Sequence, residues 1–231
     1  MKIASITFDD GSERKRSQYE LAAPLLAKLG VKATFYVCPV GIKDWKPWLE
    51  LDENGHELGS HTMTHPNLRA MASGEPFHRS FLDFEIAGSK KAIEDKTGRE
   101  CETFAYPYGE INWRVVDKVM QHYQGARAGN LKYRGCNTVP PADRFLLLQQ
   151  HIHHWAATKA ADAVYKKLAA MKSCWTIVIL HNVISKAPKG QPLRPNTLGM
   201  VELAIKNIRR AGYEFMTVRD ALRAIDGKAK A

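Results

Sequence analysis

Short apolar runs of strand length alternate with helix-type patterns along the whole 231-residue chain. Residues 3–8 (IASITF), 33–37 (ATFYV) and 176–180 (TIVIL) consist almost entirely of apolar and β-branched residues, which is typical of strands buried on both faces. Strands of this kind in alternation with helices predict parallel β/α units. Because no Pro-, Gly- or Ser-rich linker divides the sequence, we expect a single domain over residues 1–231, built as a small α/β barrel.

Proline and glycine mark several of the predicted helix ends. Pro24 fits the first turn of a helix, and Gly30, Gly98 and Gly212 each follow a helix-type pattern. Beyond the three strands above, the pattern predicts strands at residues 57–59, 103–105 and 214–218, and helices at 24–29, 47–54, 79–97, 113–122, 158–171, 198–210 and 220–225.

The chain is basic, with 34 Lys and Arg against 24 Asp and Glu and a formal net charge of +10. An excess of positive charge favours anionic partners. The basic residues are scattered instead of forming the stripe that nucleic-acid binding needs, so we expect no sequence-specific nucleic-acid binding. Acids are absent from residues 118–142 and 163–201, which favours either an anionic glycan at a positive rim or ordinary solvation of these segments.

The cysteines and the N-terminus bear on compartment and cofactors. Cys38, Cys101, Cys136 and Cys174 lie far apart without any C-x-x-C, which excludes zinc-ribbon and thioredoxin-type motifs; we expect free, mostly buried thiols. The opening residues MKIASITFDDG lack a secretory hydrophobic region, and no apolar run reaches the ~20 residues of a membrane-spanning helix. The expected location is therefore the cytoplasm, unless a leader has been removed.

Polar residues with catalytic potential follow the predicted strands. Asp9 and Asp10 follow the first strand, His61 and His65 the third, and His181 the most apolar one. In a parallel barrel the carboxyl ends of the strands converge on one mouth, so these side chains are expected to meet. Each feature alone has an ordinary explanation, such as a turn, a surface pair or a core histidine, but their joint occurrence favours an active site.

The residue types indicate a metal centre. His61 and His65 are spaced i, i+4, which on a helical turn places both imidazoles on one face. Two histidines and one carboxylate form an open zinc site, and a bound metal lowers the pKa of its water towards ~7. One aspartate of the pair then remains free as a base. A second cluster, residues 151–155 (HIHHW), lacks a third ligand and is expected to be a strand end that lines the cleft.

Four motifs resemble the polysaccharide deacetylase family (carbohydrate esterase family four). They are T-F-D-D-G at residues 7–11, H-T-M-T-H-P at 61–66, Y-P-Y-G at 106–109 and L-H-N at 180–182. The resemblance extends from about residue 3 to residue 225. It implies a distorted (β/α)7 barrel and the metal-dependent removal of acetyl groups from N-acetylated sugars.

The resemblance also implies individual roles. The metal ligands would be Asp10, His61 and His65, with zinc as the expected ion; Asp9 would be the general base and His181 the general acid. The backbone N–H of Tyr108 would stabilise the oxyanion, Pro107 would belong to the same oxyanion and substrate-binding segment, and Trp155 would form an apolar wall for the substrate.

Two positions depart from the family pattern. Ala105 occupies a position where the family often has an arginine that pairs with the base, and His154 replaces an aspartate that orients the acid. Asp143, Asp162 or another acid could substitute for that aspartate in space; without a substitute, activity would be weaker or directed to another substrate.

The expected partner is an acetylated sugar or glycan, with anionic and lipid-linked glycans among the candidates. Two alternatives stay open: the same machinery acting on a small amide or an O-acetyl ester, and a catalytically idle sugar-binding module.

Overall fold

The fold was analysed in a computed structural model that describes residues 1–72, 79–129, 135–152, 166–186 and 197–229. Its strands form one parallel sheet in the order β5-β4-β3-β2-β1-β7-β6, with β8 pairing with β1. The strands are β1 (Lys2–Gly11), β2 (Ala33–Val37), β3 (Glu57–Ser60), β4 (Thr103–Ala105), β5 (Gly125–Arg127), β6 (Gln150–His151), β7 (Cys174–Leu180) and β8 (Glu214–Phe215).

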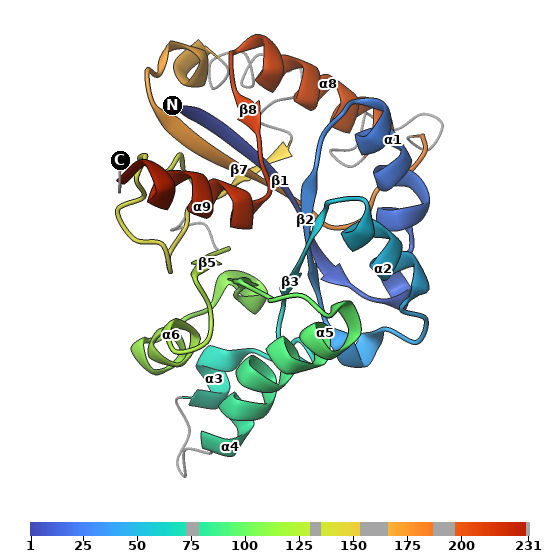
Figure 1. The fold of residues 1–231 in the computed structure, drawn as a ribbon, viewed down its shortest axis with the longest axis vertical. Coiled ribbons are helices and arrows are strands. Elements are labelled where there is room, and N and C mark those ends of the chain that lie inside the picture. The colour runs from blue at the N-terminus through green and yellow to red at the C-terminus, as the bar shows by residue number, and fades with distance from the viewer. Residues whose placement is uncertain (73–78, 130–134, 153–165, 187–196, 230–231) are drawn as a thin grey trace.

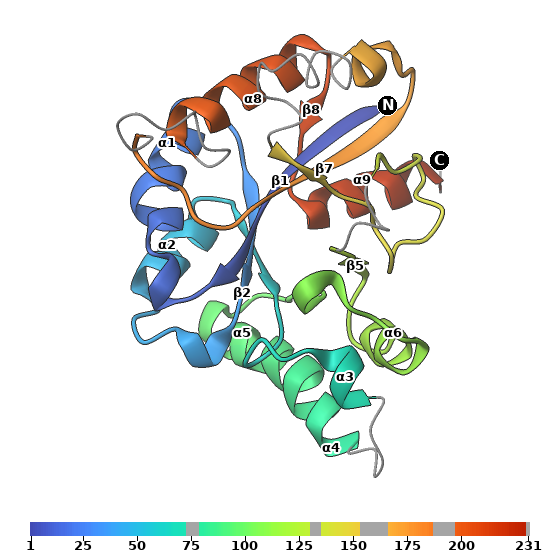
Figure 2. The same cartoon turned by 180° about the vertical axis from the view of Figure 1, so that it is seen from behind.

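Helices cover the outside of this sheet. Figure 1 shows α1 and α2 on one side of the central strands and α6 and α9 on the other, and Figure 2 shows the same arrangement from behind. The helices are α1 (Ala23–Lys28), α2 (Lys46–Glu53), α3 (Leu68–Ala72), α4 (Arg79–Leu82), α5 (Ser89–Thr97), α6 (Trp113–Met120), α8 (Leu198–Arg210) and α9 (Val218–Ala229), and residues 166–170 are also helical.

The sheet curves into a distorted barrel, as the sequence predicted. Its two ends approach each other because the segment before β6 hydrogen-bonds to β5: Leu147 N donates to Ala126 O at 3.0 Å, and Ala128 N donates to Leu147 O at 3.1 Å. The apolar core lies between sheet and helices, where Phe8 and Phe35 stack with ring centroids 4.9 Å apart. The carboxyl ends of the parallel strands therefore share one mouth.

The predicted helix at residues 79–97 is present, with one change that sequence periodicity does not reveal. Between α4 and α5 the chain forms a π-helical segment, Asp83–Gly88. A π-turn inserts an extra residue into the helix and rotates the following side chains. The π-helical segment places the buried side chain of Glu85 against the loop that follows β3.

Strand prediction was incomplete at three places. The structure adds β5 and β6, which the apolar pattern did not predict as strands in full, although the strand end at His151 was expected. The strand predicted at residues 214–218 ends at Phe215, because Thr217 Oγ1 accepts a hydrogen bond from Asp220 N and starts α9 early.

The amino-terminal part of the helix predicted at residues 158–171 lies outside the described residues.

The expectation of four free thiols was wrong for two of them. Cys136 and Cys174 form a disulfide, with their Cα atoms 6.0 Å apart. An antiparallel bridge between Asn137 and Trp175, at the start of β7, brings the two segments together, and a separation of 38 residues gave no spacing signal. Disulfides persist mainly in oxidising compartments, so this bond does not favour the expected cytoplasmic location, which stays a prediction.

The other two cysteines and the helices agree with expectation. Cys38 and Cys101 are free and buried. The helices in the described part of the chain are too short or too polar to cross a bilayer.

Candidate metal centre and its surroundings

Three predicted ligands meet at the mouth of the barrel. Asp10, His61 and His65 have ligand atoms that all lie within 4.8 Å of one another. Asp10 is the penultimate residue of β1 and the histidines follow β3, so the parallel order β1-β2-β3 brings them together across the sheet. The Nε2 atoms of His61 and His65 lie 3.5 Å and 3.2 Å from Asp10 Oδ1.

The donor atoms are oriented for a metal. The Nδ1 atom of His61 lies 2.7 Å from Ala105 O, and because a carbonyl oxygen only accepts, Nδ1 carries the hydrogen. The Nε2 lone pair of His61 is therefore directed to the centre, as is usual for a metal-binding histidine. Two imidazole nitrogens and one carboxylate oxygen match the donor set of an open zinc site, so the residues fit a divalent metal.

Asp10 lies between the two histidines and a lysine. Burial acts to raise the pKa of its carboxyl group, but the neighbouring imidazoles of His61 and His65 outweigh burial and hold that pKa well below its usual range. Lys15 Nζ lies 3.1 Å from Oδ2 of Asp10, the oxygen that does not face the histidines. The ion pair with Lys15 thus leaves Oδ1 as the oxygen directed to the metal position.

The two histidines meet through a turn and not through the expected helical turn, because residues 61–67 are not helical. Thr62 (φ 67°) and His65 (φ 64°) have left-handed backbones, as do Asp10 (φ 60°) and Tyr108 (φ 57°) elsewhere around the site. This conformation is costly for residues other than glycine and persists where surrounding contacts enforce it.

Glu85 supplies those contacts for the histidine turn. Its two carboxylate oxygens accept hydrogen bonds from Thr64, one from the backbone N–H at 2.9 Å and one from Oγ1 at 2.6 Å. Its backbone oxygen accepts from Met63 N at 3.1 Å. Sequence reasoning missed Glu85, because nothing in the local pattern signals a contact 21 residues away or the π-turn that makes it.

Asp9 faces a buried arginine. Arg127 Nη2 donates to both carboxylate oxygens of Asp9 at 2.5 Å, and the Arg127 side chain is completely buried. Nη1 of Arg127 donates to Gln149 Oε1, which fixes the other side of the guanidinium. Oδ2 of Asp9 lies 3.9 Å from Nε2 of His61, so the carboxylate borders the metal position.

One cavity of about 220 Å³ joins these groups. Tyr108 stands at its edge, 61% exposed, with its ring centroid 4.7 Å from that of His65. Gln18 Nε2 donates to both Asp9 O and His181 O, which ties the ends of β1 and β7 together. The lining residues are Asp9, Asp10, His61, His65, Tyr106, Tyr108, Gly109, Gly129, Gln149, His151, Ile179 and His181.

The cavity therefore brings together Asp9, Asp10, His61, His65, Tyr108 and His181, as the sequence predicted. Pro107 is buried directly beside Tyr108. The predicted roles of Trp155, His154 and Asp162 fall on positions outside the described residues.

The family comparison agrees with this geometry. Residues 1–124 match the family model described as Polysaccharide deacetylase. The chain belongs to the polysaccharide deacetylase family.

Its relatives in this family are of different lengths. A peptidoglycan-N-acetylglucosamine deacetylase of Listeria monocytogenes is 26% identical over 94% of this chain, but the match spans 38% of the relative's own length. One of Bacillus cereus is 28% identical, with 96% of this chain and 89% of the relative covered. The fold matches that of a family 4 acetyl xylan esterase from Clostridium thermocellum in complex with a cobalt ion (TM-score 0.63, 19% identity, 96% and 91% covered).

Arg127 bears on the first departure from the polysaccharide deacetylase pattern. In the register of β4 and β5, Ala105 pairs with Arg127, so the guanidinium reaches Asp9 from the neighbouring strand. For the second departure, the missing aspartate that orients the acid, Asp143 is no substitute, because its carboxylate accepts from Phe145 N and lines a different cavity.

Two cations from the acid-free stretches are neutralised by ion pairs: Lys118 pairs with Asp83, and Arg127 pairs with Asp9.

Proposed function

We propose that this chain is a metal-dependent deacetylase that hydrolyses the acetamide of N-acetylglucosamine units in a glycan. The observation that carries the proposal is the placement of Asp9, His181 and the three metal ligands around one cavity. The Listeria and Bacillus relatives, which are peptidoglycan-N-acetylglucosamine deacetylases, support the choice of sugar, and the cobalt complex of the Clostridium neighbour supports a divalent metal.

The residues fit the steps of amide hydrolysis. When bound by Asp10, His61 and His65, a divalent metal supplies Lewis-acid polarisation and an acidified water, and zinc suits this donor set best. Asp9, oriented by Arg127, accepts a proton from the attacking water.

The remaining groups complete the reaction. The backbone N–H of Tyr108 stabilises negative charge on the acetyl oxygen as water adds to the carbonyl carbon. His181 then donates a proton to the sugar nitrogen as the C–N bond breaks, which releases acetate and the free amine.

The test is acetate release from N-acetylglucosamine oligomers by the zinc-loaded chain. We expect turnover that is lost on chelation, and a fall of about 10²–10⁴-fold in Asp9→Asn. Glu102→Gln is the matched control, because Glu102 is also a buried carboxylate paired with an arginine, Arg223, but does not line the cavity. Turnover of O-acetyl esters alone would favour the esterase alternative, and binding without turnover would favour the idle sugar-binding module.

A further inference from the structure

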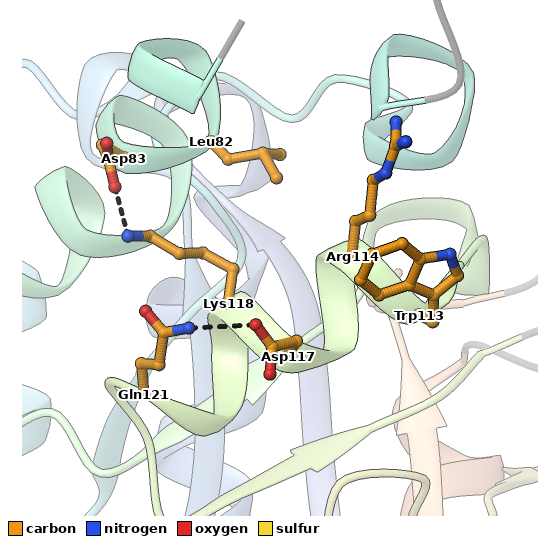
Figure 3. Close-up of a pocket in the computed structure, with 7 residues that line it drawn as sticks. All are labelled: Leu82, Asp83, Trp113, Arg114, Asp117, Lys118 and Gln121. Atoms are coloured by element: carbon orange, nitrogen blue, oxygen red, sulfur yellow. Dashed lines mark hydrogen bonds and ion pairs between the residues drawn. The ribbon is translucent and has the colours of Figure 1, made fainter. Parts of the chain in front are cut away.

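A second and larger cavity lies outside the metal centre, between two helical segments. Its volume is about 490 Å³, within the range of small-ligand sites. Figure 3 shows Leu82 and Asp83 on one wall and side chains of α6 on the other. The lining residues are Leu82, Asp83, Trp113, Arg114, Asp117, Lys118 and Gln121.

Trp113 gives this cavity an aromatic surface. Its side chain is 74% exposed, more than any other large hydrophobic side chain in the described residues. It begins α6, whose start is fixed by Asn112, because Asn112 Oδ1 accepts from Val115 N at 3.0 Å. The buried residues of α6 are Val115 and Val119, so the indole contributes nothing to the core. An exposed tryptophan beside a cavity is typical of a binding surface.

The polar groups of the cavity indicate an uncharged ligand. The positive charges of Arg114 and Lys118 equal the negative charges of Asp83 and Asp117, and Lys118 forms an ion pair with Asp83. Gln121 Nε2 donates to Asp117 Oδ2 at 3.0 Å, as the dashed line in Figure 3 shows. Charges that cancel give little attraction for a phosphate or a metal ion. An aromatic face with neighbouring hydrogen-bonding groups suits a sugar ring instead.

The second cavity is close to the metal centre along the chain. Tyr108 lines the metal cavity and Trp113 follows five residues later, which limits the separation of their Cα atoms to about 18 Å. The segment from Tyr108 to Arg114 is held against α3 by two contacts. Arg69 pairs with Glu110 at 2.8 Å, and Arg114 Nη1 donates to Ala72 O at 3.2 Å. A glycan bound at the metal centre needs only a few further sugar rings to reach Trp113.

We infer that the cavity at Trp113 is a distal sugar subsite, which binds rings of the same glycan away from the acetyl group that is removed. The identity of the glycan rests on the proposed function. A distal subsite suits the chain to polymers, because a long oligomer contacts both cavities, whereas a disaccharide at the metal centre contacts one. Binding of the long oligomer should then depend on Trp113, and binding of the disaccharide should not.

Calorimetric titration tests this inference with N-acetylglucosamine oligomers of two and six units. The protein is the full zinc-loaded chain carrying Asp9→Asn, so that substrate is not consumed. Adding Trp113→Ala should weaken hexamer binding about tenfold and leave dimer binding unchanged, because truncation of an aromatic contact residue removes its contact area. Trp113→Phe keeps an aromatic ring and should restore most of the hexamer affinity.

Several results would overturn the inference: hexamer affinity unchanged in Trp113→Ala, equal weakening of dimer and hexamer, or no hexamer binding before the substitution. Its failure differs from failure of the proposed function. If the chain with Asp9 intact releases acetate from the hexamer with the same kcat/KM in Trp113→Ala, the distal subsite is wrong and the function stands. If no acetate is released but hexamer binding requires Trp113, the function is wrong and the subsite stands.

Discussion

Arg127 and Asp9 form a buried ion pair that joins β5 to β1 across the barrel, with Nη2 2.5 Å from both carboxylate oxygens. Removing one partner of such a pair leaves the other charge buried without compensation, which costs about 3–5 kcal/mol. We therefore expect Arg127→Met to lower both the free energy of unfolding and deacetylase activity.

A double-mutant cycle in urea unfolding measures this pair. Asp9→Asn combined with Arg127→Met should lose less stability than the sum of the two single variants, because the double variant leaves neither charge alone. Strictly additive losses of unfolding free energy would contradict the buried pair.

Glu85 should control metal affinity through the histidine turn. Glu85→Gln replaces an acceptor of two Thr64 hydrogen bonds with an amide that has one acceptor oxygen. Loss of a residue that orients metal ligands typically costs 10–100-fold in affinity. We expect a loss in that range for zinc, measured by competition with a chromophoric chelator.

The control for Glu85 is Glu102→Gln. Glu102 is also a buried carboxylate, but it pairs with Arg223 and does not line the metal cavity. It should lower thermal stability without changing the zinc Kd. An unchanged zinc Kd in Glu85→Gln would show that Glu85 has a purely structural role.

His56 should make the fold less stable in mild acid. Burial, helped by the charge of Lys32, lowers the pKa of His56 from 6.5 to about 4, and its Nδ1 accepts from Ala33 N at 3.0 Å. Between these two pKa values the unfolded chain binds a proton that the folded chain does not. The contribution of neutral His56 to the free energy of unfolding is therefore complete above pH 6.5. It is lost as the pH falls towards 4, by at most about 1.4 kcal/mol per pH unit.

Urea unfolding from pH 8 to pH 4.5 measures this loss. His56→Asn keeps an acceptor for Ala33 N but does not titrate, so the stability difference between wild type and variant should be constant above pH 7 and shrink below pH 6. A constant difference over the whole range would contradict the lowered pKa.

The Cys136–Cys174 disulfide should contribute measurably to stability. It closes a loop with a sequence separation of 38, for which chain entropy predicts about 4 kcal/mol. Reduction should lower the urea midpoint of the wild type and leave that of Cys136→Ser/Cys174→Ser unchanged. Equal midpoints for the wild type with and without reductant would show that the bond does not form.

The sequence predicted the elements in which local chemistry decides the structure. The strands β1, β2 and β7 are long and apolar, and the proposed ligands Asp10, His61 and His65 lie at or just after the carboxyl ends of β1 and β3, whose parallel order determines where they meet. The resemblance of the motifs to the family added the proposed roles of these residues, which stay predictions.

The contacts that sequence reasoning missed depend on register or on irregular backbone. β5 is three residues long and contains a glycine and an arginine, so the apolar pattern gave no sign of it. The position of Arg127 beside Ala105 follows from strand pairing, and the position of Glu85 from a π-turn. Neither feature leaves a local pattern in a single sequence, because both arise from packing between distant segments.

Metal binding by Asp10, His61 and His65 underlies the proposed chemistry of this chain. Elemental analysis after dialysis against zinc tests it directly, on wild type and on His61→Ala. We expect about one zinc per chain in the wild type and loss of that zinc in the variant. Equal zinc content in the two proteins, or no zinc in either, would contradict it.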